Sequence, residues 1–420
     1  MKFSIHEAYW QHLFFAVQLY EGLDMHSAPG RQRIPVLLSL ILLMSCASPA
    51  SGNENSITLF LCGDVMSGRG VDQILPCPSD PRIHEPFMKD ARGYVKIAEQ
   101  ANGPIPRPVE FSYIWGAALE VWDRTQPDLR IINLETSITA CEELWPGKGI
   151  NYRMHPDNVS CLSQGKIDFC SLANNHTLDW GYKGLLETME TLERANIRFA
   201  GAGKNRKEAG TPAVFEIEGK ARVLVWALCM SSSGVPPKWA AGNRTPGVNL
   251  IRDFSNETIR VLATQFASIK RAGDILVVSI HWGGNWGYQI PETYRRFAHR
   301  LIDEAGVDLI HGHSSHHPRP IELYRGKLIL YGCGDFINDY EGIGGYEEYR
   351  SDLVLMYFPR IDPEDGHLIE LQMAPLKIKN FRLQRASRSD ALWLQEILNH
   401  YSPGFGARLV LGQDNRLFLK

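Results

Sequence analysis

The chain has 420 residues, of which 44% are hydrophobic and 22% carry a charged side chain. This composition is typical of a globular protein with a sizeable core and excludes a largely disordered chain. Lysine and arginine number 44 against 47 aspartate and glutamate residues, so the chain lacks the positive field that gathers nucleic acid or an anionic membrane surface. We therefore expect no nucleic-acid partner.

The first apolar segment is Ile34–Met44, which follows two arginines and precedes a run of small residues. This arrangement is typical of a signal peptide, whereas a membrane span needs about 20 apolar residues. We assign residues 1–50 to a leader and expect the mature protein to be exported to the periplasm or the cell surface. Because the segment begins late, Met25 is an alternative start of the protein.

Two processing sites are predicted after this apolar segment. Leu43-Met44-Ser45-Cys46 is similar to the bacterial lipobox, in which the cysteine is acylated after cleavage. One expectation is therefore a lipoprotein that is anchored to the membrane through Cys46. The alternative is cleavage after Ala50, which would leave a free secreted protein.

Five short apolar runs downstream each end in a polar or glycine-rich segment. The first, Ile57–Cys62, leads into Gly63-Asp64, which predicts a buried strand with a loop at its carboxyl end. The other four predicted strands are Leu129–Ile132, Phe169–Ala173, Ile275–Ile280 and Val307–Ile310. Helical patterns lie between the strands, at Gly184–Ala195, Thr258–Ala272 and Glu292–Ala305. The alternation of strands and helices predicts α/β layers.

We predict one α/β domain over residues 56–382. The proline-rich residues 76–108 are predicted to be an insertion that acts as a lid, with a surface excursion without function as the alternative. Closing strands are predicted at Asp352–Phe358, Leu368–Gln372 and Leu376–Arg382. Residues 383–420 are predicted to be a C-terminal extension of helix and strand, with a capped amphipathic helix at Ser389–Asn399.

Polar side chains at the ends of separate predicted strands indicate a metal site. Carboxylate, amide and imidazole groups together suit one or two divalent ions such as Mn, Fe or Zn. A Glu135 shared between two ions would bring them close enough to activate a common water. The six candidate metal ligands are Asp64, Glu135, Asn175, His281, His313 and His316.

Each of these side chains alone has an ordinary structural explanation. Asp64 after a glycine is typical of a turn, Glu135 of a solvated carboxylate, and His281 of a hydrogen-bonded core histidine. The cluster of four histidines between residues 311 and 317 is harder to explain in this way, because buried imidazoles near one another repel when charged. Taken together, the residues favour a metal site.

Six sequence motifs occur in order between about Ile57 and Asp339. They are Gly63-Asp64-Val65-Met66-Ser67-Gly68-Arg69, Asn133-Leu134-Glu135-Thr136, Leu172-Ala173-Asn174-Asn175-His176-Thr177-Leu178-Asp179-Trp180-Gly181, His281-Trp282-Gly283, Gly312-His313-Ser314-Ser315-His316 and Tyr331-Gly332-Cys333-Gly334-Asp335-Phe336. This set resembles the motifs of the CapA family of poly-γ-glutamate capsule-biosynthesis proteins, within the metallophosphatase superfamily. The resemblance implies a four-layer α/β sandwich of two mixed β-sheets flanked by helices, with the six candidate ligands around the metal.

The resemblance also implies roles for residues beside these ligands. It implies that His176 is the catalytic group that protonates a leaving group or stabilises developing negative charge. The side chains implied to support the ligands or to contact substrate are Arg69, Asn174, Asp179, His317 and Asp335.

The chain departs from the wider phosphatase pattern at several motifs. Asp64-Val65-Met66 stands where many phosphatases have Asp-x-His, so one metal position lacks an imidazole. Glu135 replaces the usual bridging aspartate, and the last histidine pair is spaced His-x-x-His. Asp335 stands where the family often has asparagine, which adds a carboxylate near the site.

These observations favour an exported metal-dependent hydrolase that acts on a phosphate ester, or on an amide or ester bond, during synthesis of poly-γ-glutamate or a related cell-surface polymer. The alternative is a non-catalytic component that binds an anionic polymer within a membrane-associated capsule-synthesis complex. His176 favours the enzyme, because a binding protein needs cations in its cleft but no acid or base. The expected partner is an anionic cell-surface polymer or a phosphoester substrate.

Overall fold

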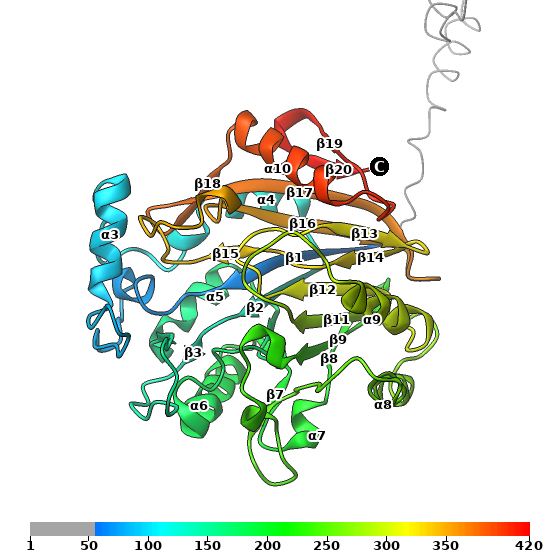
Figure 1. Ribbon diagram of the computed structural model, residues 1–420, viewed down its shortest axis with the longest axis horizontal. Coiled ribbons are helices and arrows are strands. Elements are labelled where there is room, and N and C mark those ends of the chain that lie inside the picture. Colours follow the sequence, from blue (N-terminus) through cyan, green and yellow to red (C-terminus); the bar gives the residue numbers. More distant parts are fainter. Residues whose placement is uncertain (1–54) are drawn as a thin grey trace, which may run out of the picture. The chain divides into compact units, whose positions relative to one another are not determined.

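Two large β-sheets face each other in residues 55–420, the part of the chain that the computed structural model describes (Figure 1). The predicted leader at residues 1–50, with its apolar run at 34–44 and Cys46, lies outside the described residues. Among the helices of residues 55–420, none has both the length and the apolar character that crossing a bilayer requires.

The larger sheet has ten strands in the order β19-β20-β17-β16-β1-β2-β5-β6, with β15 paired to β1 and β18 paired to β17. Strands β1, β2, β5 and β6 are parallel, whereas β16 runs antiparallel to β1. The bounds are β1 Ile57–Val65, β2 Leu129–Leu134, β5 Phe169–Ser171, β6 Arg198–Ala200, β15 Asp335–Ile337, β16 Leu353–Ile361, β17 Leu368–Lys379, β18 Arg382–Arg385, β19 Leu409–Leu411 and β20 Leu417–Leu419.

The second sheet has six strands in the order β13-β14-β12-β11-β9-β8. Its four inner strands are parallel and its two edge strands are antiparallel to their neighbours. The bounds are β8 Ala213–Ile217, β9 Ala221–Cys229, β11 Ile275–His281, β12 Leu309–His313, β13 Ile321–Tyr324 and β14 Lys327–Leu330. Two short ribbons complete the strands, one of β3 Ser137–Ile138 with β4 Arg153–Met154 and one of β7 Ala202–Gly203 with β10 Gly247–Val248.

Alternate residues of the second sheet enter two different cores, because successive side chains of a strand point to opposite faces. Val225 and Val277 belong to the core shared with the larger sheet, whereas Trp226 and Val278 belong to a core formed with α8 and α9. On the larger sheet, α4 and α10 contact β17 (Figure 1). The helices are α3 Arg92–Asn102, α4 Ala117–Thr125, α5 Ser160–Gln164, α6 Gly181–Arg194, α7 Arg206–Ala209, α8 Asn256–Ala267, α9 Glu292–Asp303 and α10 Arg388–Tyr401. The predicted α/β fold, with two mixed sheets flanked by helices, is confirmed.

The predicted strand Leu368–Gln372 and the first part of the predicted strand Leu376–Arg382 form the single strand β17, which continues through Pro375 and ends at Lys379. Arg382 already belongs to β18. A proline lacks the N–H that a sheet ladder uses. β17 pairs with β20 at Gln372 and Met373, and with β18 from Leu376 onward. On this side of β17, Pro375 lies between the two partners, while on the other side it stands opposite Leu355 of β16.

Residues 383–420 continue the same compact unit as the residues before them. β20 pairs with β17, and α10 begins at a capping box in which Ser387 and Asp390 bond each other's backbone N–H groups. These contacts satisfy donors that a helix start leaves without partners. The proline-rich residues 76–108 carry α3, whose residue Tyr94 is buried.

Candidate metal centre

The metal-ligand candidates lie at the carboxyl ends of parallel strands from both sheets. Asp64 lies in β1, Glu135 follows β2 and Asn175 follows β5, all in the larger sheet. His281 and His313 end β11 and β12 of the second sheet and stand opposite each other in its register. A hydrogen bond of 2.6 Å between the Nε2 of His311 and the carbonyl oxygen of Cys62 joins the two sheets beneath these ends. The fold therefore brings residues from distant parts of the sequence to one place.

Gly63 allows β1 to approach β15 closely, which brings Asp64 beside Asp335. A Cβ on Gly63 would lie 1.6 Å from the carbonyl oxygen of Gly334, so no larger residue fits. The backbone N–H of Asp64 donates to that same oxygen at 2.9 Å, and Asp64 pairs with Asp335 in the register of the two strands. Two carboxylates from residues 271 positions apart in the chain thus stand side by side.

Two buried groups of potential ligands share the Asp64 carboxylate. One group combines Asp64 with His281 and His313, and the other combines Asp64 with His316 and Asp335. In each group the ligand atoms all lie within 4.8 Å of one another. Carboxylate oxygens and imidazole nitrogens at this separation fit divalent transition ions, and a shared carboxylate suits two neighbouring ions.

His281 and His313 form the imidazole pair of the first group. Their Nδ1 atoms are 2.8 Å apart, while the Nε2 of His281 lies 3.0 Å from the Oδ1 of Asn175 and the Nε2 of His313 lies 2.9 Å from the Oγ of Ser279. Burial, followed by the neighbouring imidazoles, holds the pKa of both rings well below the ordinary histidine value. Both rings are therefore neutral at physiological pH, which is the state that binds a metal ion.

His316 and Asp335 form the second group with Asp64. The Nδ1 of His316 lies 2.8 Å from the Oδ1 of Asp335, and the other carboxylate oxygen of Asp335 accepts a hydrogen bond of 2.7 Å from the Nδ2 of Asn338. Burial opposes protonation of His316, but the charge and hydrogen bond of Asp335 raise its pKa overall. Asp335, which the sequence suggested as a supporting group, is thus positioned as a ligand.

Glu135 lies beside Asp64 but belongs to neither of the two tight groups found among residues 55–420. The Nδ2 of Asn133 donates to Asp64 at 2.8 Å and to Glu135 at 3.4 Å. Burial raises the pKa of Asp64 to about 7, and burial together with the charge of Asp64 raises the pKa of Glu135 well above its usual range. The geometry therefore makes Asp64, and not Glu135, the carboxylate that the two ligand groups share. Glu135 lies beside Asp64 and is available as a further ligand.

His176 faces this centre without belonging to either ligand group. Its Nε2 lies 3.8 Å from the Oε1 of Glu135, and its Nδ1 lies 2.7 Å from the Oδ2 of Asp179 and 3.0 Å from the Nζ of Lys148. Burial and then the charge of Lys148 lower the pKa of His176 to about 4. The Asp179 carboxylate is itself held by the backbone N–H of Tyr152 at 2.7 Å. Sequence reasoning missed Lys148, whose only signal is a single cation in a glycine-rich loop.

Asn174 organises the turn that carries Asn175 and His176. Its Nδ2 donates to the Oδ1 of Asn133 at 3.1 Å and to the carbonyl oxygen of Leu134 at 2.9 Å, while its Oδ1 accepts the backbone N–H of His176 at 3.0 Å. Asn174 therefore fixes this turn against β2. In the fixed turn, the Asn175 side chain contacts His281 and the His176 side chain contacts Asp179.

Arg69 and His317 lie outside the two ligand groups. The Arg69 guanidinium bonds Asp339 through Nε at 2.8 Å and Glu85 through Nη1 at 2.9 Å. Glu85 belongs to the proline-rich segment, so this buried ion pair attaches that segment to the loop after β1. His317 packs against Tyr349, with ring centroids 4.7 Å apart. Its role is therefore packing beside the site.

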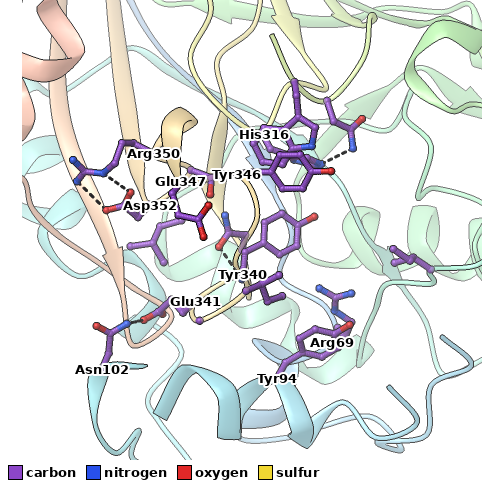
Figure 2. Close-up of a pocket in the computed structure, with 18 of the residues that line it drawn as sticks. Arg69, Tyr94, Asn102, His316, Tyr340, Glu341, Tyr346, Glu347, Arg350 and Asp352 are labelled. Atoms are coloured by element: carbon purple, nitrogen blue, oxygen red, sulfur yellow. Dashed lines mark hydrogen bonds and ion pairs between the residues drawn. The ribbon is translucent and has the colours of Figure 1, made fainter. Parts of the chain in front are cut away.

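A cleft of about 640 Å³ opens beside this centre, with His316 among its lining residues (Figure 2). Its walls come from the loop after β1, from α3, from the loop after β11 and from the segment between β15 and β16. Figure 2 shows Tyr346 beside His316 and, across the opening, Arg69 beside Tyr94. A ligand in this cleft would reach the ligand groups from the His316 side.

Comparison with known proteins identifies the family of the chain. Residues 58–340 match the family model described as Bacterial capsule synthesis protein PGA_cap. The chain is 51% identical, over 87% of its length and 97% of the other chain, to a protein of Mycobacterium tuberculosis named "Probable polyglutamine synthesis accessory protein". It is 28% identical to the PGA biosynthesis protein CapA of Bacillus subtilis, over 55% of this chain and 58% of the other.

A crystal structure of a phosphatase from Mycoplasma pneumoniae aligns with a TM-score of 0.43 and 14% identity, over 77% of this chain and 94% of the other. The family match covers most of the described unit and includes all six motifs, and the mycobacterial relative matches over nearly its whole length. The chain therefore belongs to the bacterial capsule synthesis protein family PGA_cap, which confirms the CapA resemblance of its motifs.

Proposed function

We propose that this capsule-synthesis family protein is an exported metal-dependent hydrolase that acts on a cell-surface polymer. The observation that carries the proposal is the Asp64 carboxylate shared by two buried groups of ligand atoms. A shared carboxylate holds two ions close together, as in enzymes that hydrolyse phosphate esters and amides. Family membership supports a task in the synthesis of poly-γ-glutamate or a related capsule polymer.

The donor set fits Mn, Fe or Zn, because carboxylate oxygens, imidazole nitrogens and the Asn175 amide oxygen are buried together. Such ions activate water and polarise a phosphoryl or carbonyl oxygen. The residues that would hold them are Asp64, Glu135, Asn175, His281, His313, His316 and Asp335.

The protein's own contribution to chemistry comes from His176. Asp179 and Lys148 occupy the Nδ1 side of the ring, so Nε2 is the atom directed toward the ligand groups. Because Nδ1–H faces the Asp179 carboxylate, the neutral ring carries no proton at Nε2. A proton taken up at Nε2 would stabilise the negative charge that develops on a leaving group. Asp179 fixes the ring orientation in which this contact forms.

The non-catalytic alternative has one specific observation in its favour. The mycobacterial relative carries the word accessory in its name, and an accessory protein could bind a polymer in the cleft without cleaving it. The His176 arrangement favours the enzyme over this alternative, because binding alone does not need an imidazole held by Asp179 beside the ligand groups.

The test combines metal analysis with a substrate panel. The purified mature protein is expected to contain bound divalent metal and to hydrolyse a phosphodiester or a γ-glutamyl peptide. His176→Asn is expected to retain metal while losing roughly 100-fold or more in turnover. The matched control is His400→Asn, which changes an exposed histidine of α10.

Two outcomes contradict the enzyme, namely absence of bound metal and absence of turnover on the whole panel. Unchanged turnover in His176→Asn would contradict the catalytic role of this histidine. Retained polymer binding without turnover would favour the accessory role. Loss of metal in His176→Asn would instead make this histidine a ligand.

Export is proposed from the apolar segment before residue 50. That segment lies outside the described residues. Mass spectrometry of the protein from its native host is expected to find an acylated Cys46 at the N-terminus. A terminus after Ala50 would contradict the lipid anchor but keep export. An intact Met1 or Met25 would contradict export itself.

A further inference from the structure

The cleft beside the metal centre carries no excess of positive charge. Its three cationic side chains are Arg69, Arg350 and Lys377, and its three acidic side chains are Glu341, Glu347 and Asp352. A polymer with a carboxylate on every unit would need cations available to receive those charges. The balance of side-chain charge in the lining gives such a polymer no electrostatic advantage away from the metal centre.

Each of the three cations is also already paired within the protein. Arg69 bonds Glu85 and Asp339, as described above. Arg350 bonds Asp352 at 2.9 Å and Asp390 at 2.8 Å, and the Nζ of Lys377 lies 3.2 Å from the same Asp352 carboxylate. An anionic ligand would have to compete with these carboxylates, which weakens its attraction further.

Aromatic rings form much of the remaining lining. Tyr94 and Tyr152 line the wall around Arg69, while Trp286, Tyr340 and Tyr346 line the wall around His316. The rings of Trp286 and Tyr346 stack with centroids 4.1 Å apart and planes 6° apart. Tyr346 is 49% exposed, so this stack offers a flat surface at the edge of the cleft (Figure 2).

Exposed apolar side chains concentrate around the same opening. Of the nine large hydrophobic side chains that are exposed among residues 55–420, four line this one cleft. They are Phe87, Ile150, Ile343 and Tyr346. Apolar surface gathered at a concave site marks a place that a ligand covers.

A sugar ring matches both features of the lining. Its C–H faces are apolar and pack flat against aromatic rings, while its rim of hydroxyl groups bonds amide and carboxylate side chains. Asn102, Asn285 and Glu347 supply such groups along the cleft. We propose that the cleft binds an uncharged run of saccharide units in a cell-surface glycan. This inference rests on the proposed hydrolase function, for which it names the substrate class.

Binding of the metal-loaded mature protein to an array of neutral oligosaccharides, with hexa-γ-glutamate beside them, tests the proposal. At least one neutral oligosaccharide is expected to bind, and titration calorimetry with that sugar is expected to show little dependence on salt. Trp286→Ala and Tyr346→Ala should each weaken its binding about tenfold or more. Trp286→Phe should weaken it less. Val261→Ala, an exposed apolar residue of α8 outside the cleft, serves as the matched control.

The proposal is overturned if no neutral oligosaccharide on the array binds, whether or not hexa-γ-glutamate does. It is also overturned if both the Trp286 and Tyr346 alanine variants bind the sugar as the wild type does. Asp64→Asn separates this result from the hydrolase proposal, because it should lose metal-dependent turnover and keep saccharide binding. Saccharide binding by a wild-type protein without hydrolysis would refute the enzyme alone, whereas hydrolysis without saccharide binding would refute this inference alone.

Discussion

In the metal-free protein, replacing Asp64 with asparagine is expected to remove a large part of the pH dependence of stability. Burial raises the pKa of this carboxyl to about 7, whereas an unfolded aspartate titrates near 3.9. Between about pH 4 and about pH 7 the folded state therefore binds a proton that the unfolded state has released. The free energy of unfolding falls as pH rises through this window.

The magnitude follows from the width of that window. Each pH unit changes the free energy of unfolding by about 1.4 kcal/mol, so the whole window corresponds to about 4 kcal/mol. Asp64 is fully buried, so solvent screening does not reduce this figure. In Asp64→Asn the raised pKa of Glu135 should also decrease, because the charge of Asp64 contributes to it.

Urea unfolding in the presence of a chelator, at about pH 5 and about pH 7, measures the effect. Over this interval the wild type should lose about 2 kcal/mol more than Asp64→Asn, because the carboxyl is already half titrated at about pH 7. Asp123→Asn, an exposed aspartate of α4, should behave like the wild type. Parallel losses in the wild type and Asp64→Asn would refute the reasoning, because they would show that this carboxyl does not hold the proton.

Three further predictions concern the centre and its surroundings. Asp335→Asn should reduce the metal bound in calorimetry from two equivalents to one, and His281→Ala should remove the other equivalent. Two equivalents in Asp335→Asn would contradict the role of Asp335 as a ligand. Gly63→Ala should lower the free energy of unfolding by about 3 kcal/mol in urea titrations, because its Cβ would clash with β15. Lys148→Met should raise the pKa of His176 above about 4 in an NMR titration of the metal-free protein, because the Lys148 charge lowers it. An unchanged pKa would contradict that assignment.

The predicted strands share the buried positions of the observed ones, but several of their ends differ. The prediction ended the first strand at Cys62, yet β1 continues to Val65 because β15 pairs with it at Asp64 and Val65. No local pattern reveals a partner that lies about 270 residues away. The Thr258–Ala272 prediction likewise extends beyond α8, which ends at Ala267. Strand β9 is not among the five predicted strands, and no local pattern indicates that it pairs with β8 and β11.

Residue type and strand position were sufficient to select the candidate ligands. Strand ends of a parallel sheet meet at one edge, so His281 and His313 could be grouped before the structure was known. Their meeting with Asp64 depends on how the two sheets face each other. Two assignments depend on distances that only the structure provides. The shared position of Asp64 depends on the approach of β1 to β15, and Lys148 depends on the path of a loop that has no periodic pattern.

Asp335 offers a physical explanation for Met66, which stands where many phosphatases have a histidine. Met66 stands where an imidazole is expected, and its Sδ lies 3.5 Å from the Oη of Tyr340, so it packs beside the cleft. Strand pairing places the Asp335 carboxylate opposite Asp64, where it is positioned to replace the missing imidazole as a ligand. The replacement changes the chemistry of that position, because it adds a negative charge and an oxygen donor in place of a nitrogen.

The two ligand groups should therefore prefer different ions. Oxygen-rich sites favour Mn over Zn relative to imidazole-rich sites, so the group with Asp335 is expected to select Mn more strongly than the group with His281 and His313. Competition calorimetry should resolve two classes of site whose ratio of Mn to Zn affinity differs, and Asp335→Asn should abolish the class that favours Mn. The matched variant Asp303→Asn, on α9, should leave both classes intact. Identical Mn to Zn ratios at both positions would show that Asp335 does not take the place of the missing imidazole. The second ion would then need another ligand, for which Glu135 is the candidate, because the Asn133 amide contacts both Glu135 and Asp64.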